Sequence, residues 1–194
     1  MKRFVLGLII GLIAIPIAAY VYFRAGHPPV AVADHPFPFE KQIVKVPLNA
    51  RIDSEMPHNP PIEATDANLV AGAVIYRAQC AACHGLNGQP SSFASHMYPD
   101  APQLWAPHHN GKVVGVSDDP PGETYWKIAN GIRLTGMPSF QKTLDETQMW
   151  QVALLLSHAD KPLPAAAHLA VTQPIDFTVS SAPLTPPATD SHRK

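Results

Sequence analysis

Cysteine is almost absent from this chain of 194 residues, and charge of either sign is scarce. Only two cysteines occur, so the second C-x-x-C pair that a structural zinc site usually requires is missing. Charged residues make up 15% of the chain, and the formal net charge is −1. A balance this close to neutral gives no electrostatic basis for binding nucleic acid. The length allows one domain with appendages.

Charge is entirely missing from the run 4–23, which Lys2 and Arg3 precede and Arg24 follows. At about 1.5 Å per residue, such a helix nearly spans a hydrocarbon core of about 30 Å. We therefore expect a transmembrane anchor over 1–24, with a cytoplasmic N-terminus because the basic residues are in excess there. The rest of the chain would then lie in the periplasm of a bacterium. A cleaved signal peptide is the alternative.

Proline, with 22 residues, is concentrated on either side of the middle of the chain. Segment 25–62 is predicted to be a proline-rich tether of extended backbone without long helices. Within it, Gln42–Val46 could form a short edge strand or lie against the folded domain. Segment 161–194, rich in proline and alanine, is predicted to be a disordered tail. The folded domain is therefore expected over 63–160.

The two cysteines belong to the segment Cys80-Ala81-Ala82-Cys83-His84. This spacing is typical of covalent c-type haem attachment, in which both thiols add to the porphyrin and the histidine binds iron. A neutral imidazole offers one nitrogen to iron, while the other needs a hydrogen-bond acceptor that fixes the ring. The motif predicts one haem c, held through Cys80 and Cys83, with His84 as an iron ligand.

Two other kinds of site use similar residues. A zinc ion would need Cys80, Cys83 and His84 to converge, but consecutive residues rarely aim at one tetrahedral ion. A thiol–disulfide oxidoreductase would place the C-x-x-C motif near a βαβ unit, and no such pattern surrounds it here. A disulfide between Cys80 and Cys83 would close too small a loop to stabilise much.

Residues 63–160 resemble a class I cytochrome c domain, and the resemblance extends beyond the haem-attachment motif. Asp66 could cap a helix that leads into Cys80, and Thr143-x-x-Glu146 reads as a capping box before the last helix. The resemblance implies an all-α fold, a small cytochrome c fold with crossing first and last helices around one haem, here preceded by a transmembrane helix. The residues that match the crossing are Gly72, Tyr76 and Trp150.

A second iron ligand is expected from the segment Asn130–Phe140, which follows a predicted helix over 123–130 that Gly131 ends. Its sequence is similar to the methionine loop of the family, and Met137 is the expected ligand. A thioether is soft and uncharged, so it raises the reduction potential relative to a second imidazole. The remaining candidate ligands are Met97, His96, His108 and His109.

The resemblance also implies residues around the ligands. Pro102 matches the proline whose carbonyl orients the axial histidine, although the spacing is long and Pro90 is an alternative. Trp126 and Arg133 could reach a haem propionate. Trp126 could equally be a packed core residue, and Arg133 could equally be a solvated side chain.

With both faces of the iron occupied, no position remains for a substrate, so the chain is predicted to be an electron carrier rather than an enzyme. The expected partners are redox proteins at the membrane surface, together with the membrane itself through residues 4–23. No small-molecule substrate and no nucleic acid are expected. Two alternatives stay open: a haem c subunit of a larger membrane dehydrogenase or oxidase, and a ligand-binding haem sensor or peroxidase.

Overall fold

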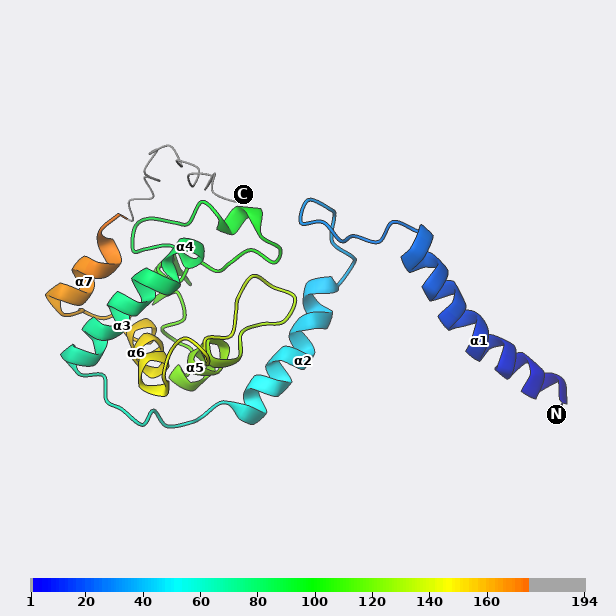
Figure 1. The fold of residues 1–194 in the computed structure, drawn as a ribbon, viewed down its shortest axis with the longest axis horizontal. Helices are drawn as coiled ribbons and strands as arrows, with labels where there is room; N and C mark the ends of the chain where they lie inside the picture. Colours follow the sequence, from blue (N-terminus) through cyan, green and yellow to red (C-terminus); the bar gives the residue numbers. More distant parts are fainter. Residues whose placement is uncertain (1, 175–194) are drawn as a thin grey trace, which may run out of the picture.

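The computed structural model describes residues 2–174, and this part of the chain is mostly helical (Figure 1). A helical turn and a two-stranded antiparallel hairpin interrupt the helices. The elements are α1 (Lys2–Ala25), α2 (Glu40–Glu55), α3 (Asp66–Gln79), α4 (Ala81–His84), the 3-10 turn η1 (Ala94–His96), β1 (Pro107–His108), β2 (Val113–Val114), α5 (Pro121–Asn130), α6 (Glu146–Leu156) and α7 (Ala165–Thr172).

The core lies where α3 crosses α6, in agreement with the expected all-α fold. Tyr76 on α3 and Trp150 on α6 are 0% and 1% exposed, and Trp150 stacks on Tyr125 of α5 with ring centroids 4.3 Å apart. The helices touch at Gly72, where a Cβ atom would lie only 2.2 Å from the backbone oxygen of Gln151. The absence of a side chain at Gly72 therefore permits the close crossing.

Both expected helix caps are displaced from the predicted residue. The hydroxyl of Thr65, not the carboxylate of Asp66, caps α3 by accepting from the backbone N–H of Asn68. At α6 the capping box is Asp145-x-x-Gln148, with two reciprocal hydrogen bonds of 2.8 and 2.9 Å. In each case the capping residue is the one with extended backbone directly before the first residue of the helix.

The expectation of an extended tether without long helices is wrong for its central part. Residues 40–55 form α2, and the segment Gln42–Val46 is helical rather than an edge strand. Pro47 removes one backbone hydrogen-bond donor, but tertiary contacts offset that loss. Ile52 is 2% exposed, and the carbonyl of Pro57 lies against Gly122 at the start of α5.

The expected disordered tail is also wrong for its first part. Helix α7 packs on α3, and Ala167 and Val171 are fully buried. Arg77 of α3 donates to the carbonyls of Ala170, Gln173 and Pro174, which satisfies backbone acceptors at the C-terminal end of α7. The remainder of the predicted tail, 175–194, lies outside the described residues.

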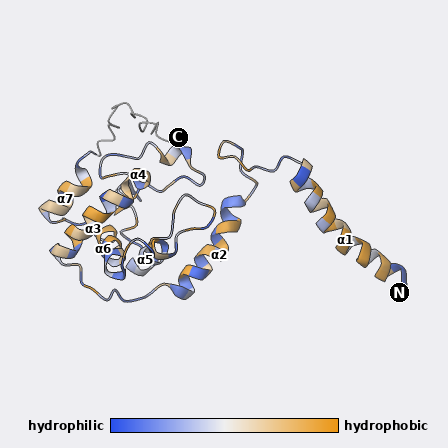
Figure 2. Ribbon diagram, in the orientation of Figure 1, coloured by the Kyte–Doolittle hydropathy of each residue, from blue (hydrophilic) through white to orange (hydrophobic). Residues whose placement is uncertain are grey.

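Helix α1 has 24 residues, none of them buried, and an 18-residue window with a mean hydropathy of 2.6 (Figure 2). At about 1.5 Å per residue it is about 36 Å long, enough to cross a membrane. Tyr20, Tyr22 and Arg24 lie near its C-terminal end, where aromatic and basic side chains favour a membrane interface. Length and composition are therefore consistent with the predicted anchor.

Candidate haem site

The haem-attachment motif lies at the turn from α3 into the one-turn helix α4. The backbone N–H groups of Cys83 and His84 donate to the carbonyl of Cys80 at 3.1 and 3.0 Å. Gly85 ends the turn with φ +73°, a conformation that side chains rarely adopt. These bonds hold the two thiols and the imidazole on one turn of backbone.

The imidazole of His84 has a defined orientation. Its Nδ1 lies 2.8 Å from the carbonyl oxygen of Pro102, and the acceptor is therefore Pro102 rather than Pro90. A carbonyl can only accept, so Nδ1 carries the proton and Nε2 keeps its lone pair. Burial lowers the pKa of His84 below its ordinary value despite this hydrogen bond, so the ring is neutral at pH 7. A neutral ring with a free Nε2 is the form that binds a metal.

Two further hydrogen bonds fasten the Pro102 segment to the motif. The backbone N–H of Leu104 donates to the carbonyl of His84 at 3.2 Å, and Nε2 of Gln103 donates to the carbonyl of Cys83 at the same distance. The Oε1 atom of Gln103 also accepts from the backbone N–H of Ser91 at 2.6 Å. Gln103 is thus a site residue that the sequence prediction did not single out, although it lies within the segment that resembles the family.

The chemistry of the thiols argues against the two competing kinds of site. Burial, and secondarily the neighbouring Cys83, raise the pKa of Cys80 to about 12, so its thiol is protonated at neutral pH. Thiol–disulfide oxidoreductases instead depend on a thiolate with a lowered pKa. Within residues 2–174, no group of three or more His, Cys, Asp or Glu side chains is placed to hold a metal ion, which disfavours zinc.

The methionine loop is a compact turn at the C-terminal end of α5. Gly131 ends α5 with φ +66°, and a Cβ there would lie 2.6 Å from the backbone of Pro138, so the loop folds back closely on itself. The backbone N–H of Ile132 donates to the carbonyl of Met137 at 3.2 Å, and the hydroxyl of Thr135 accepts from the N–H of Met137 at 3.1 Å. Met137 is partly buried against the core. The backbone around the predicted ligand is thus well defined.

The other candidate ligands occupy different surroundings. Met97 is partly buried, and its terminal methyl carbon lies 2.2 Å from the position that a Cβ of Gly136 would occupy. His96, His108 and His109 are exposed, and Nε2 of His108 lies 2.6 Å from the carbonyl of Gly115. Met97 thus approaches the methionine loop at Gly136.

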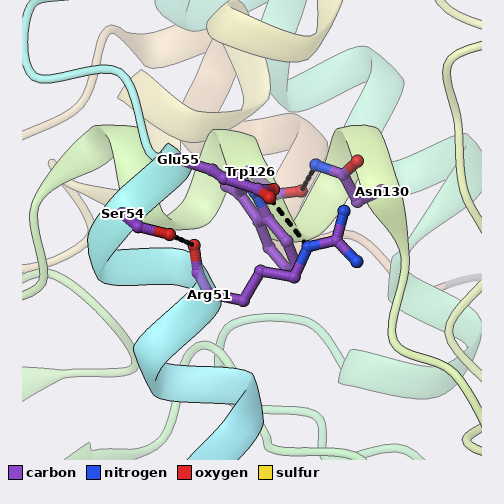
Figure 3. Close-up of polar contacts among 5 residues, drawn as sticks. All are labelled: Arg51, Ser54, Glu55, Trp126 and Asn130. Carbon is purple, nitrogen blue, oxygen red and sulfur yellow. Dashed lines mark hydrogen bonds and ion pairs between the residues drawn. The ribbon is translucent and has the colours of Figure 1, made fainter.

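Trp126 and Arg133, the two predicted propionate contacts, lie in different surroundings. The indole N–H of Trp126 donates to Oε2 of Glu55 at 3.0 Å, and Arg51 binds the other carboxylate oxygen (Figure 3). An indole has one donor, so a propionate would have to displace Glu55. We therefore interpret Trp126 as the attachment point of α2. Arg133 is exposed in the methionine loop. Nothing in the sequence near Glu55 indicated this pairing, which joins residues 71 positions apart.

A comparison with known protein families gives a match over residues 67–156, from α3 to the end of α6. These residues match the family model described as cytochrome c oxidase, cbb3-type, subunit III. This segment is a c-type cytochrome domain. No curated protein and no solved structure matches the chain.

A c-type cytochrome carries covalent haem c, and the residues of this domain fit that group. Two thiols stand three residues apart, that of Cys80 is protonated, and a neutral imidazole keeps a free Nε2 on the same turn. The domain is thus a haem protein of electron transport.

Proposed function

We propose that this chain is a membrane-anchored, periplasmic electron carrier whose haem iron is bound by His84 and Met137. The haem supplies an iron centre that accepts and returns one electron at a time. The observation that carries the proposal is the 2.8 Å contact between Nδ1 of His84 and the carbonyl of Pro102, within a domain that matches a c-type cytochrome family.

In this proposal, each residue of the site has a separate task. Cys80 and Cys83 hold the porphyrin, and His84 binds iron through Nε2 while Pro102 fixes its ring. Met137 supplies the sulfur on the other face, presented by the Gly131 turn and the Thr135 hydrogen bond. With both ligands bound, the iron would exchange electrons and would keep no position for a substrate.

The best test of the ligand assignment is the variant Met137→His. Replacing sulfur by nitrogen should lower the midpoint potential by on the order of 0.1 V, a fraction of the roughly 0.8 V range that axial ligands cover. The sulfur-to-iron charge-transfer band of the ferric protein should disappear as well. Met97→Leu is the matched control, because Met97 lies beside the same loop.

The outcomes separate the candidate functions. An unchanged midpoint and band in Met137→His, with loss of the band in Met97→Leu, would assign the sulfur to Met97. A shift of the ferrous spectrum on adding carbon monoxide to the wild type would indicate an open position, and hence a ligand-binding sensor or peroxidase rather than a carrier.

The membrane part of the proposal rests on α1. Its length and hydropathy suit a single-pass anchor, and the basic residues Lys2 and Arg3 favour a cytoplasmic N-terminus. A cleaved signal sequence is also apolar and follows basic residues, so the two possibilities must be distinguished. The intact mass of the haem protein from the membrane fraction distinguishes them. A mass that includes residues 1–25 supports the anchor, and a mass without them assigns α1 to a cleaved signal peptide.

A second candidate is a haem c subunit of a larger oxidase. The matching family is described as subunit III of a cbb3-type oxidase, and this description favours the candidate. Extraction in mild detergent followed by size separation distinguishes the two. A haem protein that migrates with further haem-containing subunits would support the subunit, and one that migrates alone would support the free carrier.

A further inference from the structure

Helix α2 carries two different faces along its length. Residues that contact the cytochrome domain recur on one side and include the buried Ile52. Apolar residues recur on the opposite side at the spacing i, i+3, i+4, i+7, and all of them are exposed. We call Lys41, Leu48, Ile52 and Glu55 the inner face, and Ile43, Val46, Pro47 and Ala50 the outer face.

The inner face attaches α2 at both of its ends. Glu55 accepts the hydrogen bond from Trp126 of α5 at 3.0 Å, beside the buried Ile52. At the other end, the ammonium group of Lys41 lies 5.5 Å from the ring centroid of Tyr98. Since two separate parts of the domain hold α2, its outer face has a fixed direction relative to the haem site.

Within residues 2–174, the outer face of α2 is left exposed. Ile43 is 66% exposed and Val46 is 70% exposed, and the hydropathy colouring of Figure 2 places this apolar stretch in the first half of α2. A helix face with several exposed apolar side chains ordinarily has a partner. Within residues 2–174, the main helix contacts of α2 are those of its inner face with α5.

The loop that leads into α2 approaches the end of α1 (Figure 1). The ring of Phe37 is 6.2 Å from the ring of Tyr22, centroid to centroid, and Tyr22 belongs to the last turns of α1. Glu40, the first residue of α2, is three positions beyond Phe37.

From this arrangement we propose that the outer face of α2 lies on the lipid surface at the end of α1. The occupant is lipid because the chain itself brings Phe37, and with it the start of α2, to the end of a helix that spans the bilayer. The inference rests on the proposed membrane anchoring of α1. Ile43 and Val46 enter the interface with their apolar side chains.

Lipid contact at this face orients the cytochrome domain. The same helix is bound to α5, and α5 leads directly into the methionine loop. The haem domain would therefore meet membrane-bound redox partners in a restricted range of orientations, whereas a tether of extended chain would let it turn freely.

The test uses the full haem-loaded chain in lipid nanodiscs that each hold one copy. Val46→Cys carries a fluorescent label on the outer face, and Asn49→Cys carries it on an exposed flank of α2 that points away from the outer face. Haem attachment occupies Cys80 and Cys83, so each variant has one reactive thiol. The quencher is a phosphatidylcholine with a nitroxide near its headgroup. The fluorescence of each variant is divided by its fluorescence in discs without nitroxide. This ratio cancels the quenching that the haem causes in both kinds of disc.

We expect a loss of fluorescence for the label at 46 and none for the label at 49. Equal quenching at both positions, or none at either, would overturn the proposal. A label at 46 that is shielded from aqueous iodide yet unquenched by the lipid would mean that protein covers this face, which also overturns it. Retention of the protein in the disc is measured separately. A protein that leaves the disc refutes both the anchor and this inference. A retained protein with an unquenched label at position 46 refutes this inference alone.

Discussion

The crossing of α3 and α6 makes a quantitative prediction for Gly72→Ala. A Cβ at this position would lie 2.2 Å from the backbone oxygen of Gln151 and 2.7 Å from its carbonyl carbon. An ordinary C···O approach is about 3.3 Å, so the helices would have to separate by about 1 Å. Alanine favours the helix over glycine by about 1 kcal/mol, but backbone on the opposite side cannot move like a flexible side chain. We therefore expect overpacking to win, with a net loss of about 2 kcal/mol of unfolding free energy.

The assay is denaturant unfolding of the haem-loaded protein, followed by far-ultraviolet circular dichroism. A loss of about 2 kcal/mol corresponds to a fall of roughly 8–16 °C in Tm for a domain of this size. Val74→Ala on the exposed side of the same helix is the control, and it should stay within about 0.5 kcal/mol of the wild type. If Gly72→Ala raised the unfolding free energy by about 1 kcal/mol, helix propensity would dominate and the close crossing would not be a constraint.

Three further predictions concern the haem and the two added helices. Cys80→Ala combined with Cys83→Ala should yield little folded protein, because the porphyrin supplies part of the core; a cooperative, haem-free helical domain would contradict this. Trp126→Phe should speed amide hydrogen exchange in α2 while α6 exchanges as before. The Trp126 hydrogen bond lowers the pKa of Glu55, so the attachment is complete above the ordinary pKa of that carboxyl group and weakens as pH falls through its folded value. Arg77→Ala should cost about 1–2 kcal/mol in urea unfolding and release α7, since it removes charged donors to three carbonyls; unchanged exchange in α7 would count against that role.

The parts of the fold that the sequence predicted are those in which a local pattern and the tertiary environment agree. The attachment motif requires one turn of helix after another helix, and α3 and α4 form such a unit. The segment before Gly131 is helical and ends where predicted, because glycine readily adopts the positive φ at that position. At the caps of α3 and α6, polar residues one or two positions apart can each cap a helix, and the prediction chose Asp66 instead of Thr65 and Thr143 instead of Asp145.

The two helices that the sequence analysis missed are stabilised by contacts that no local pattern reveals. Proline content predicted extended backbone before residue 63, yet inside α2 only Pro47 interrupts a segment whose Ile52 and Glu55 meet α5. For α7, the alanine-rich composition suggested disorder. Alanine is also the strongest helix former, and α3 supplies both the surface that buries Ala167 and the guanidinium that caps the last carbonyls.

These two helices lie outside the segment that matches the family, and each supports a helix that leads to a haem ligand of the proposed site. Helix α7 packs on α3, which ends at Cys80, and α2 binds α5, which ends at the loop carrying Met137. In a domain whose core of its own is modest, contacts on the outer sides of both helices restrict how far either ligand segment can move. Loosening α7 should therefore affect the thioether and histidine side of the haem, whereas loosening α2 should affect the methionine side.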